Sequence, residues 1–158
     1  MRTTQRISVR DLVEFLLRCG DLDRRQSSGR RDAQAMQAGS RIHRKLQKQM
    51  GSGYQAEVTL KHQILLEDIP VSVEGRADGI WTDKRGEEPL IVIDEIKGTY
   101  RDLSRMEAPV EVHLAQAKCY AYMYGVKQDL EKIGVQITYC HLETEQIKRI
   151  FYCYTMGE

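Results

Sequence analysis

The 158-residue sequence contains no long apolar segment and no signal for export. A membrane-spanning helix needs roughly 20 consecutive apolar residues, and no run in this sequence approaches that length. The basic N-terminal segment also lacks the apolar stretch of a signal peptide. These absences disfavour membrane-embedded and exported proteins, and we expect a cytoplasmic protein. With 41% hydrophobic and 30% charged residues, the chain has the composition and length of one globular domain.

Closely spaced cysteines are also absent. The four cysteines are scattered along the chain and none forms a Cys-x-x-Cys pair. Zinc and iron–sulfur sites usually draw on such pairs. In a cytoplasmic chain, isolated cysteines are most simply interpreted as reduced and mainly packed thiols.

The net charge is only +1, but the charges are unevenly distributed. Residues 1–50 contain 12 Lys and Arg against 5 Asp and Glu, whereas the remainder contains 12 against 18. A basic N-terminal part is suited to an anionic partner, and an acidic remainder can supply metal ligands. For any single charge, a solvated helix face is an equally good interpretation.

The spacing of apolar residues predicts an α/β fold. The expected helices cover residues 9–19, 33–50 and 110–124, and the expected strands cover 58–64, 71–80, 90–93, 135–142 and 147–154. The strand at 90–93 is apolar on both faces, which is typical of the middle of a sheet. We therefore expect a single domain over 1–158 with a central mixed β-sheet flanked by helices. Within it, a basic helix and loop at 1–32 would precede a core at 33–158.

Charged residues interrupt two of these strands where each one ends. Asp78 ends one strand, and Glu95-Ile96-Lys97 ends the next. Alternation puts Glu95 and Lys97 on one face, and antiparallel pairing through a short turn would bring Asp78 beside Glu95. Facing carboxylates repel unless a cation lies between them, so the pattern predicts a site for a divalent ion such as Mg²⁺. The Lys97 ammonium could then orient or deprotonate a water and offset charge in the transition state.

A surface salt bridge between Glu95 and Lys97 is the alternative interpretation. The acid-x-Lys triplet alone favours that salt bridge, because such triplets are common. Its position directly after a buried strand, with Asp78 before it, favours the catalytic interpretation. Two further acids, Glu57 and Asp94, lie near the expected site. We interpret Glu57 as a strand-surface residue or an outer partner of the site, and we assign no role to Asp94.

These residues resemble the central motif of the PD-(D/E)XK nucleases. The matching segments are Gly-Arg-Ala-Asp78-Gly and Ile-Val-Ile-Asp-Glu95-Ile-Lys97-Gly. Gly39-Ser-Arg-Ile-His43 is similar to the Gly-x-x-x-His helix of the RecB-like branch, which includes CRISPR-associated exonucleases, and Gln116-Ala-Lys-Cys-Tyr120 to its Gln-x-x-x-Tyr helix. The four motifs follow the family order over residues 39–120. The resemblance implies a restriction-endonuclease-like core.

The resemblance also implies a role for each matched residue. Asp78 and Glu95 would bind Mg²⁺ or Mn²⁺. His43 and the backbone carbonyl of Ile96 would supply further ligands, and Lys97 would position the attacking water. Without its companion motifs, His43 on an inward helix face would be interpreted as a core histidine.

DNA is the expected partner. The resemblance implies that Gln116 and Tyr120 hold the DNA end or backbone near the metal, although a helix–sheet hydrogen bond and a core position are the alternatives. Independently, we expect the basic segment to contact phosphates, unless it is only a solvated loop. Its arginines are Arg24, Arg25, Arg30 and Arg31.

The sequence departs from the family in its cysteines. Many relatives on this branch bind an iron–sulfur cluster through one cysteine before the His motif and three after the Tyr motif. Cys19 fits the first position, but the later three are missing at cluster spacing, so we expect no cluster. The expected function is a metal-dependent DNA nuclease, acting from ends in repair or recombination. The alternatives are a catalytically silent DNA-binding module and the nuclease accessory of a helicase. Truncation of the chain at its C-terminus would fit the accessory alternative.

Overall fold

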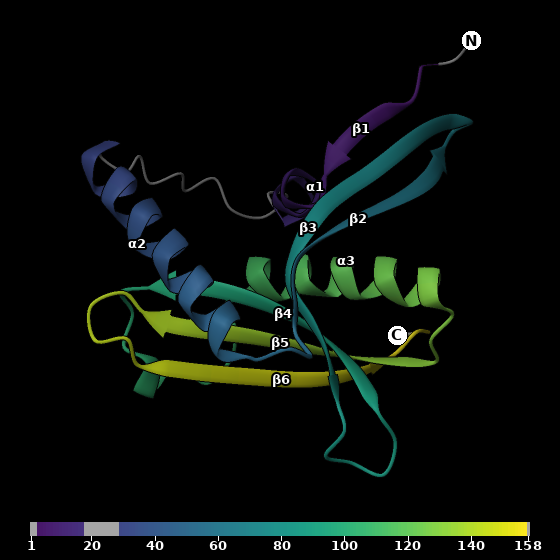
Figure 1. Cartoon of the computed structure of the whole chain (residues 1–158). Helices are drawn as coiled ribbons and strands as arrows, with labels where there is room; N and C mark the ends of the chain where they lie inside the picture. The colour runs from purple at the N-terminus through teal and green to yellow at the C-terminus, as the bar shows by residue number, and fades with distance from the viewer. Residues whose placement is uncertain (1–2, 18–28, 158) are drawn as a thin grey trace.

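The computed structural model in Figure 1 describes residues 3–17 and 29–157, with the backbone alone for 29–36. Within these residues the chain forms a six-stranded mixed sheet flanked by three α-helices. The strands are β1 (Gln5–Ser8), β2 (Gln55–Leu66), β3 (Ile69–Asp83), β4 (Leu90–Thr99), β5 (Lys132–His141) and β6 (Ile147–Thr155). The helices are α1 (Val9–Leu17), α2 (Gly29–Gln49) and α3 (Glu111–Gln128), with a short 3-10 helix η2 (Leu103–Arg105).

The long strand β3 organises the sheet. Along one side β3 pairs with the whole of β2 in an antiparallel hairpin. Along the other side it pairs first with β1, in parallel, and then with β4, antiparallel. The pairing with β4 ends at Gly79 opposite Asp94, and β4 continues alongside β5. The two strands therefore separate at a fork directly beside Asp78 and Glu95.

Two helix layers cover the part of the sheet formed by β4, β5 and β6. On one face α3 packs with α1 over the main core, which includes Ile93, Val135 and Ile137. On the other face α2 crosses the strands (Figure 1), and its Ile42 packs in a smaller cluster with Ile96. Because alternate residues of β4 point to opposite faces, one apolar strand serves both cores.

The structure confirms the expected α/β class and the central mixed sheet. It adds β1, which the sequence analysis missed because this four-residue strand is mostly exposed and has no clear alternation. It also starts α2 at Gly29 rather than at 33, so Arg30 and Arg31 belong to the helix and not to a loop. Because β1 pairs with β3, the N-terminal segment is part of the same sheet as the rest of the chain.

Two other predicted boundaries were wrong. Helix α3 continues past Gly125 to Gln128 and ends at Asp129, which has a left-handed backbone. Gly125 lies inside this helix, and a glycine is needed there because Met156 packs where a side chain would be. The β2–β3 turn is only Glu67–Asp68, both with positive φ, whereas the sequence analysis left residues 65–70 between the two expected strands.

None of the described helices is both long and apolar enough to cross a membrane.

We expect Gly79→Ala to destabilise the protein by about 1–3 kcal/mol, the usual effect of overpacking. A Cβ atom at Gly79 would overlap the ring of Tyr54, which is buried against the strand. Gly86→Ala is the matched control, because its Cβ would meet only the Glu88 carbonyl oxygen at 3.8 Å. Urea unfolding measures both effects, and equal stabilities for the two variants would contradict this packing.

Candidate metal centre

The fork between β3 and β4 brings Asp78 and Glu95 together. Gly79 is paired with Asp94, so the next residues, Asp78 and Glu95, lie across the point where the strands separate. The Ile96 N–H makes no bond to β3 and donates instead to Asp78 Oδ2 at 2.7 Å. A buried carboxylate held by a backbone N–H has a fixed orientation. The fork thus positions one carboxylate of the site through the backbone itself.

Glu95 is the most buried acid of the group. Only 5% of its surface is exposed, and its Oε1 lies 3.1 Å from Lys97 Nζ. Its Oε2 is buried without a hydrogen-bond partner among the described residues. Burial, together with the negative charge of Asp78, raises the pKa of Glu95 to about 7, although the Lys97 ammonium acts in the opposite direction. An unpartnered buried oxygen is costly, and a cation or a proton is what would offset that cost here.

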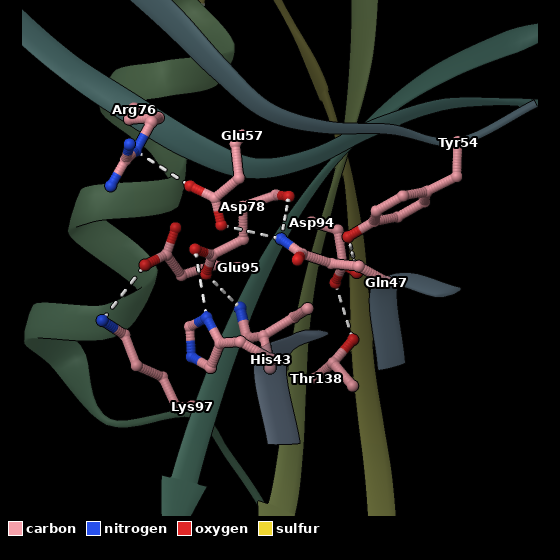
Figure 2. A network of polar contacts seen from close by, with 11 residues as sticks. His43, Gln47, Tyr54, Glu57, Arg76, Asp78, Asp94, Glu95, Lys97 and Thr138 are labelled. Carbon is pink, nitrogen blue, oxygen red and sulfur yellow. Dashed lines mark hydrogen bonds and ion pairs between the residues drawn. The ribbon is translucent and has the colours of Figure 1, made fainter. Parts of the chain in front are cut away.

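Helix α2 delivers His43 to this site. His43 Nδ1 lies 3.4 Å from Asp78 Oδ1. Figure 2 shows the two side chains pointing toward each other. Burial alone would lower the pKa of His43, but the hydrogen bond and negative charge of Asp78 outweigh burial, so that the pKa is raised. His43 therefore reaches an acidic cluster, whereas its neighbour Ile42 packs in the apolar cluster with Ile96.

Glu57 completes the cluster from β2. The pairs Ala56–Gly79 and Val58–Ala77 place Glu57 opposite Asp78. Its φ of 57° lies in the left-handed region, which non-glycine residues rarely adopt. Arg76 Nε contacts Glu57 Oε2 at 2.8 Å. The Glu57 side chain is 42% exposed, as a strand-surface residue would be, and it also lies beside Asp78.

Gln47, one turn after His43 on α2, connects two parts of the cluster. Its amide nitrogen donates to Glu57 Oε1 at 2.9 Å and to the backbone oxygen of Asp78 at 2.8 Å. The same helix face therefore supplies the imidazole and holds a carboxylate in place (Figure 2). Sequence analysis missed Gln47 and gave Glu57 only as strand surface or an outer partner of the site. The hairpin register could have identified Glu57, because a two-residue turn at Glu67–Asp68 places Glu57 opposite Asp78.

His43, Glu57 and Asp78 could hold one metal ion. One ligand atom from each lies within 4.8 Å of the other two. Protein ligands of divalent cations lie roughly 2.0–2.6 Å from the ion, so atoms on opposite sides of one ion are separated by about 4–5 Å. Two carboxylates and an imidazole suit a divalent cation. Glu95 is not a member of this compact group, but its unpartnered Oε2 provides a further oxygen beside Asp78.

Asp94 serves the opposite face of the strand. It accepts hydrogen bonds from Tyr54 at 2.8 Å, from Thr138 at 2.6 Å and from Gln136 at 3.4 Å. Burial raises the pKa of Asp94, and these hydrogen bonds act against that rise. Since Asp94 and Glu95 are adjacent, this network anchors the backbone that carries Glu95. Asp94 is therefore a support beneath the cluster and not a member of it.

Of the two residues predicted to hold DNA, Tyr120 and Gln116, one lines the cavity at the site and the other does not. Tyr120 on α3 lines the same cavity as His43 and Asp78. Burial raises its pKa, as do the negative charges of Glu95 and Asp78. Gln116, one turn earlier, is 5% exposed and is not among the residues that line this cavity. The structure thus brings Tyr120, but not Gln116, to the cavity wall.

Several predicted roles fall elsewhere. Arg24 and Arg25 lie outside the described residues, as does Cys19, and the side chains of Arg30 and Arg31 are not described. The backbone of Ile96 is held at the fork by its N–H, and the ligand role expected of its carbonyl stays a prediction.

We expect Glu95 to make the metal-free protein less stable as pH rises. Its carboxyl titrates near 4.5 in the unfolded chain and near 7 in the fold. The folded state therefore binds that proton more tightly, so the linked stability is complete below about pH 4.5 and is lost as the pH rises through about 7. In EDTA, melting temperatures should fall between about pH 4.5 and pH 7 less steeply for Glu95→Gln than for wild type.

Glu88→Gln is the control for this pH dependence. Glu88 is exposed and lies 3.7 Å from Lys132, so it also pairs with a lysine but outside the cluster. That variant should keep the wild-type pH profile. Identical profiles for Glu95→Gln and wild type would contradict the raised pKa.

A scan against models of protein families gave no match, and a search of curated proteins found no relative. Among solved structures, one described as "Crystal structure of SSO0001" is similar to this chain, with a TM-score of 0.61 and 19% sequence identity. The similarity covers 96% of this chain and 68% of that chain. At this level of identity the likeness shows the fold alone, and the fold is a mixed α/β core.

Proposed function

We propose that this chain is a metal-dependent nuclease that hydrolyses phosphodiester bonds in DNA. The observation that carries the proposal is the convergence of Asp78, Glu95 and His43 at the β3–β4 fork, with one oxygen of Glu95 buried and unpartnered. Burying two carboxylates side by side is unfavourable for folding. A cation bound between the two carboxylates would offset this cost.

Mg²⁺ or Mn²⁺ is the proposed cofactor, held by His43, Glu57 and Asp78 with Glu95 adjacent. When bound, such an ion polarises a phosphoryl oxygen and lowers the pKa of a coordinated water. The Ile96 N–H keeps Asp78 oriented, and Gln47 keeps Glu57 oriented. These contacts prepare the ligands before the ion arrives, which reduces the reorganisation that binding needs.

Lys97 provides the group that acts on water. Its ammonium is mostly buried and lies 3.1 Å from Glu95 Oε1, so its position is fixed on the acidic face of β4. From there it can hold a water by hydrogen bonding and offset the negative charge that develops on the phosphoryl oxygens. The salt bridge with Glu95 is thus compatible with catalysis, because the same contact orients the ammonium.

The proposed substrate is DNA, attacked from its ends in repair or recombination. Support comes from the resemblance to the RecB-like branch of the PD-(D/E)XK nucleases and from the cavity that Tyr120 shares with His43 and Asp78. The same proposal places the protein in the cytoplasm, where its DNA substrate would be. It also makes a helicase a candidate partner. Linear and circular substrates, each single- and double-stranded, distinguish end-directed from internal cleavage.

We expect cleavage of linear DNA to require Mg²⁺ or Mn²⁺ and to fall at least about 100-fold in Asp78→Asn, Glu95→Gln and Lys97→Ala. Loss of one group that stabilises transition-state charge has about that effect on the turnover rate. Time courses on end-labelled oligonucleotides measure it. Glu88→Gln, which alters an exposed glutamate–lysine pair, should cleave as wild type does. Wild-type rates in the three folded site variants would refute the assignment.

We expect His43→Ala and Glu57→Gln each to weaken Mn²⁺ binding at least about tenfold, since even outer partners of metal ligands contribute about 10–100-fold. Electron paramagnetic resonance of free Mn²⁺ measures the affinity. Glu74→Gln is the matched control, because Glu74 is also a strand carboxylate near basic side chains, 3.9 Å from both Lys61 and Arg6. If Glu57→Gln binds Mn²⁺ like wild type while Glu95→Gln does not, the ion lies nearer Glu95 and Glu57 is not a ligand.

A further inference from the structure

The metal centre opens into a cavity of about 920 Å³, whose walls carry three arginines. Arg10 comes from α1, Arg44 from α2 and Arg76 from β3. His43 and Asp78 line the same cavity. Three cations from separate parts of the chain therefore surround an acidic centre, and sequence analysis marked none of them.

Their surroundings differ, but each remains accessible. Arg10 Nε is 3.4 Å from Glu14 on the same helix, and its side chain is 76% exposed. Arg76 pairs with Glu57, yet its side chain is 66% exposed. Arg44 is exposed and forms no ion pair with any acid in the described part of the chain. Much of each guanidinium is therefore free to bind a second group.

Two other polar cavities among the described residues contain fewer arginines. The cavity beside the β3–β4 hairpin contains Glu87 and Glu88 against Lys132 and no arginine. In the cavity between α2 and the β5–β6 loop, Arg41 is the single arginine, and Lys45 is bound to Glu145 at 2.8 Å. Exposed ion pairs contribute little to stability, so folding alone does not explain three arginines around one opening. Guanidinium groups match the geometry of phosphate oxygens, and converging positive charge attracts a polyanion.

Gly39 adds a second feature of the same wall. It lies inside α2, where glycine is unfavourable relative to alanine. A Cβ atom there would meet nothing within 4 Å among the described residues, so packing does not require glycine. Its open space faces the cavity, where the missing side chain leaves room for a ligand backbone to approach the helix.

We propose that Arg10, Arg44 and Arg76 form a phosphate-binding wall, and that Gly39 leaves space for the DNA strand held against it. The wall binds phosphates that neighbour the one at the metal centre. This inference rests on the proposed nuclease function, because it takes DNA as the ligand. It deepens that function by naming the residues that hold the strand, and these residues are distinct from those that act on it.

The test is the salt dependence of DNA binding in EDTA, measured by fluorescence anisotropy with a labelled single-stranded oligonucleotide. Each phosphate contact contributes about 0.7 to the slope of log affinity against log salt for a single strand. The double variant Arg10→Gln/Arg44→Gln should lose about 0.7 for each of its two contacts. Arg149→Gln, an exposed arginine on β6 outside the cavity, is the control and should keep the wild-type slope.

Gly39→Leu provides an independent variant, because leucine is a good helix former and its Cβ would enter open space. It should melt no lower than wild type but bind the oligonucleotide more weakly. An unchanged slope in the double variant, an equal loss in Arg149→Gln, or wild-type affinity in a folded Gly39→Leu would overturn the inference. Cleavage is measured separately. Normal cleavage with an unchanged slope would refute the phosphate-binding wall and not the nuclease function, whereas failure of wild type both to bind and to cleave would refute both proposals.

Discussion

The hydrogen bond from the Ile96 N–H to Asp78 Oδ2 is the interaction on which the site depends. It exists because β3 and β4 stop pairing at Gly79 and Asp94, which frees a buried N–H that has to find another acceptor. A side-chain carboxylate takes the place of a strand carbonyl. The local break in the sheet and the acidic centre are therefore one structural feature, and a continuous β3–β4 ladder would have no site.

Two supports hold this fork in shape. Helix α2 contributes His43 and Gln47, which contact Asp78 and Glu57. On the face of β4 that α2 covers, Asp94 accepts hydrogen bonds from Tyr54 and other side chains and fixes the backbone that leads into Glu95. The cluster itself is electrostatically unfavourable without a cation, since burial and Asp78 raise the pKa of Glu95. The fold thus uses well-satisfied contacts around the centre to maintain an unsatisfied group within it.

The elements with strong periodicity could be predicted from the sequence, and the weak ones could not. The run at 90–93 and the helix that carries His43 have clear apolar patterns, so the mixed sheet and its helix layers followed from local spacing. β1 is short and mostly exposed, and only its pairing with β3 makes it a strand. The expected helix ended at 124, before Gly125, whereas α3 continues to Gln128 and Gly125 is where Met156 packs closely against it.

For the site, the sequence by itself determined which strands carry Asp78, Glu95 and Lys97 and which helix face carries His43, because alternation and helical spacing are local properties. The sequence analysis ended both strands at these residues, whereas β3 continues to Asp83 and β4 to Thr99, and only the pairing between them stops there. Only the tertiary structure decided that Glu57 and Gln47 join them and that Asp94 turns away. It also brought Arg10, Arg44 and Arg76 around one cavity. Those placements depend on the hairpin register, the fork in the sheet and the packing of α1 and α2. Such contacts join residues tens of positions apart, and no local pattern encodes them.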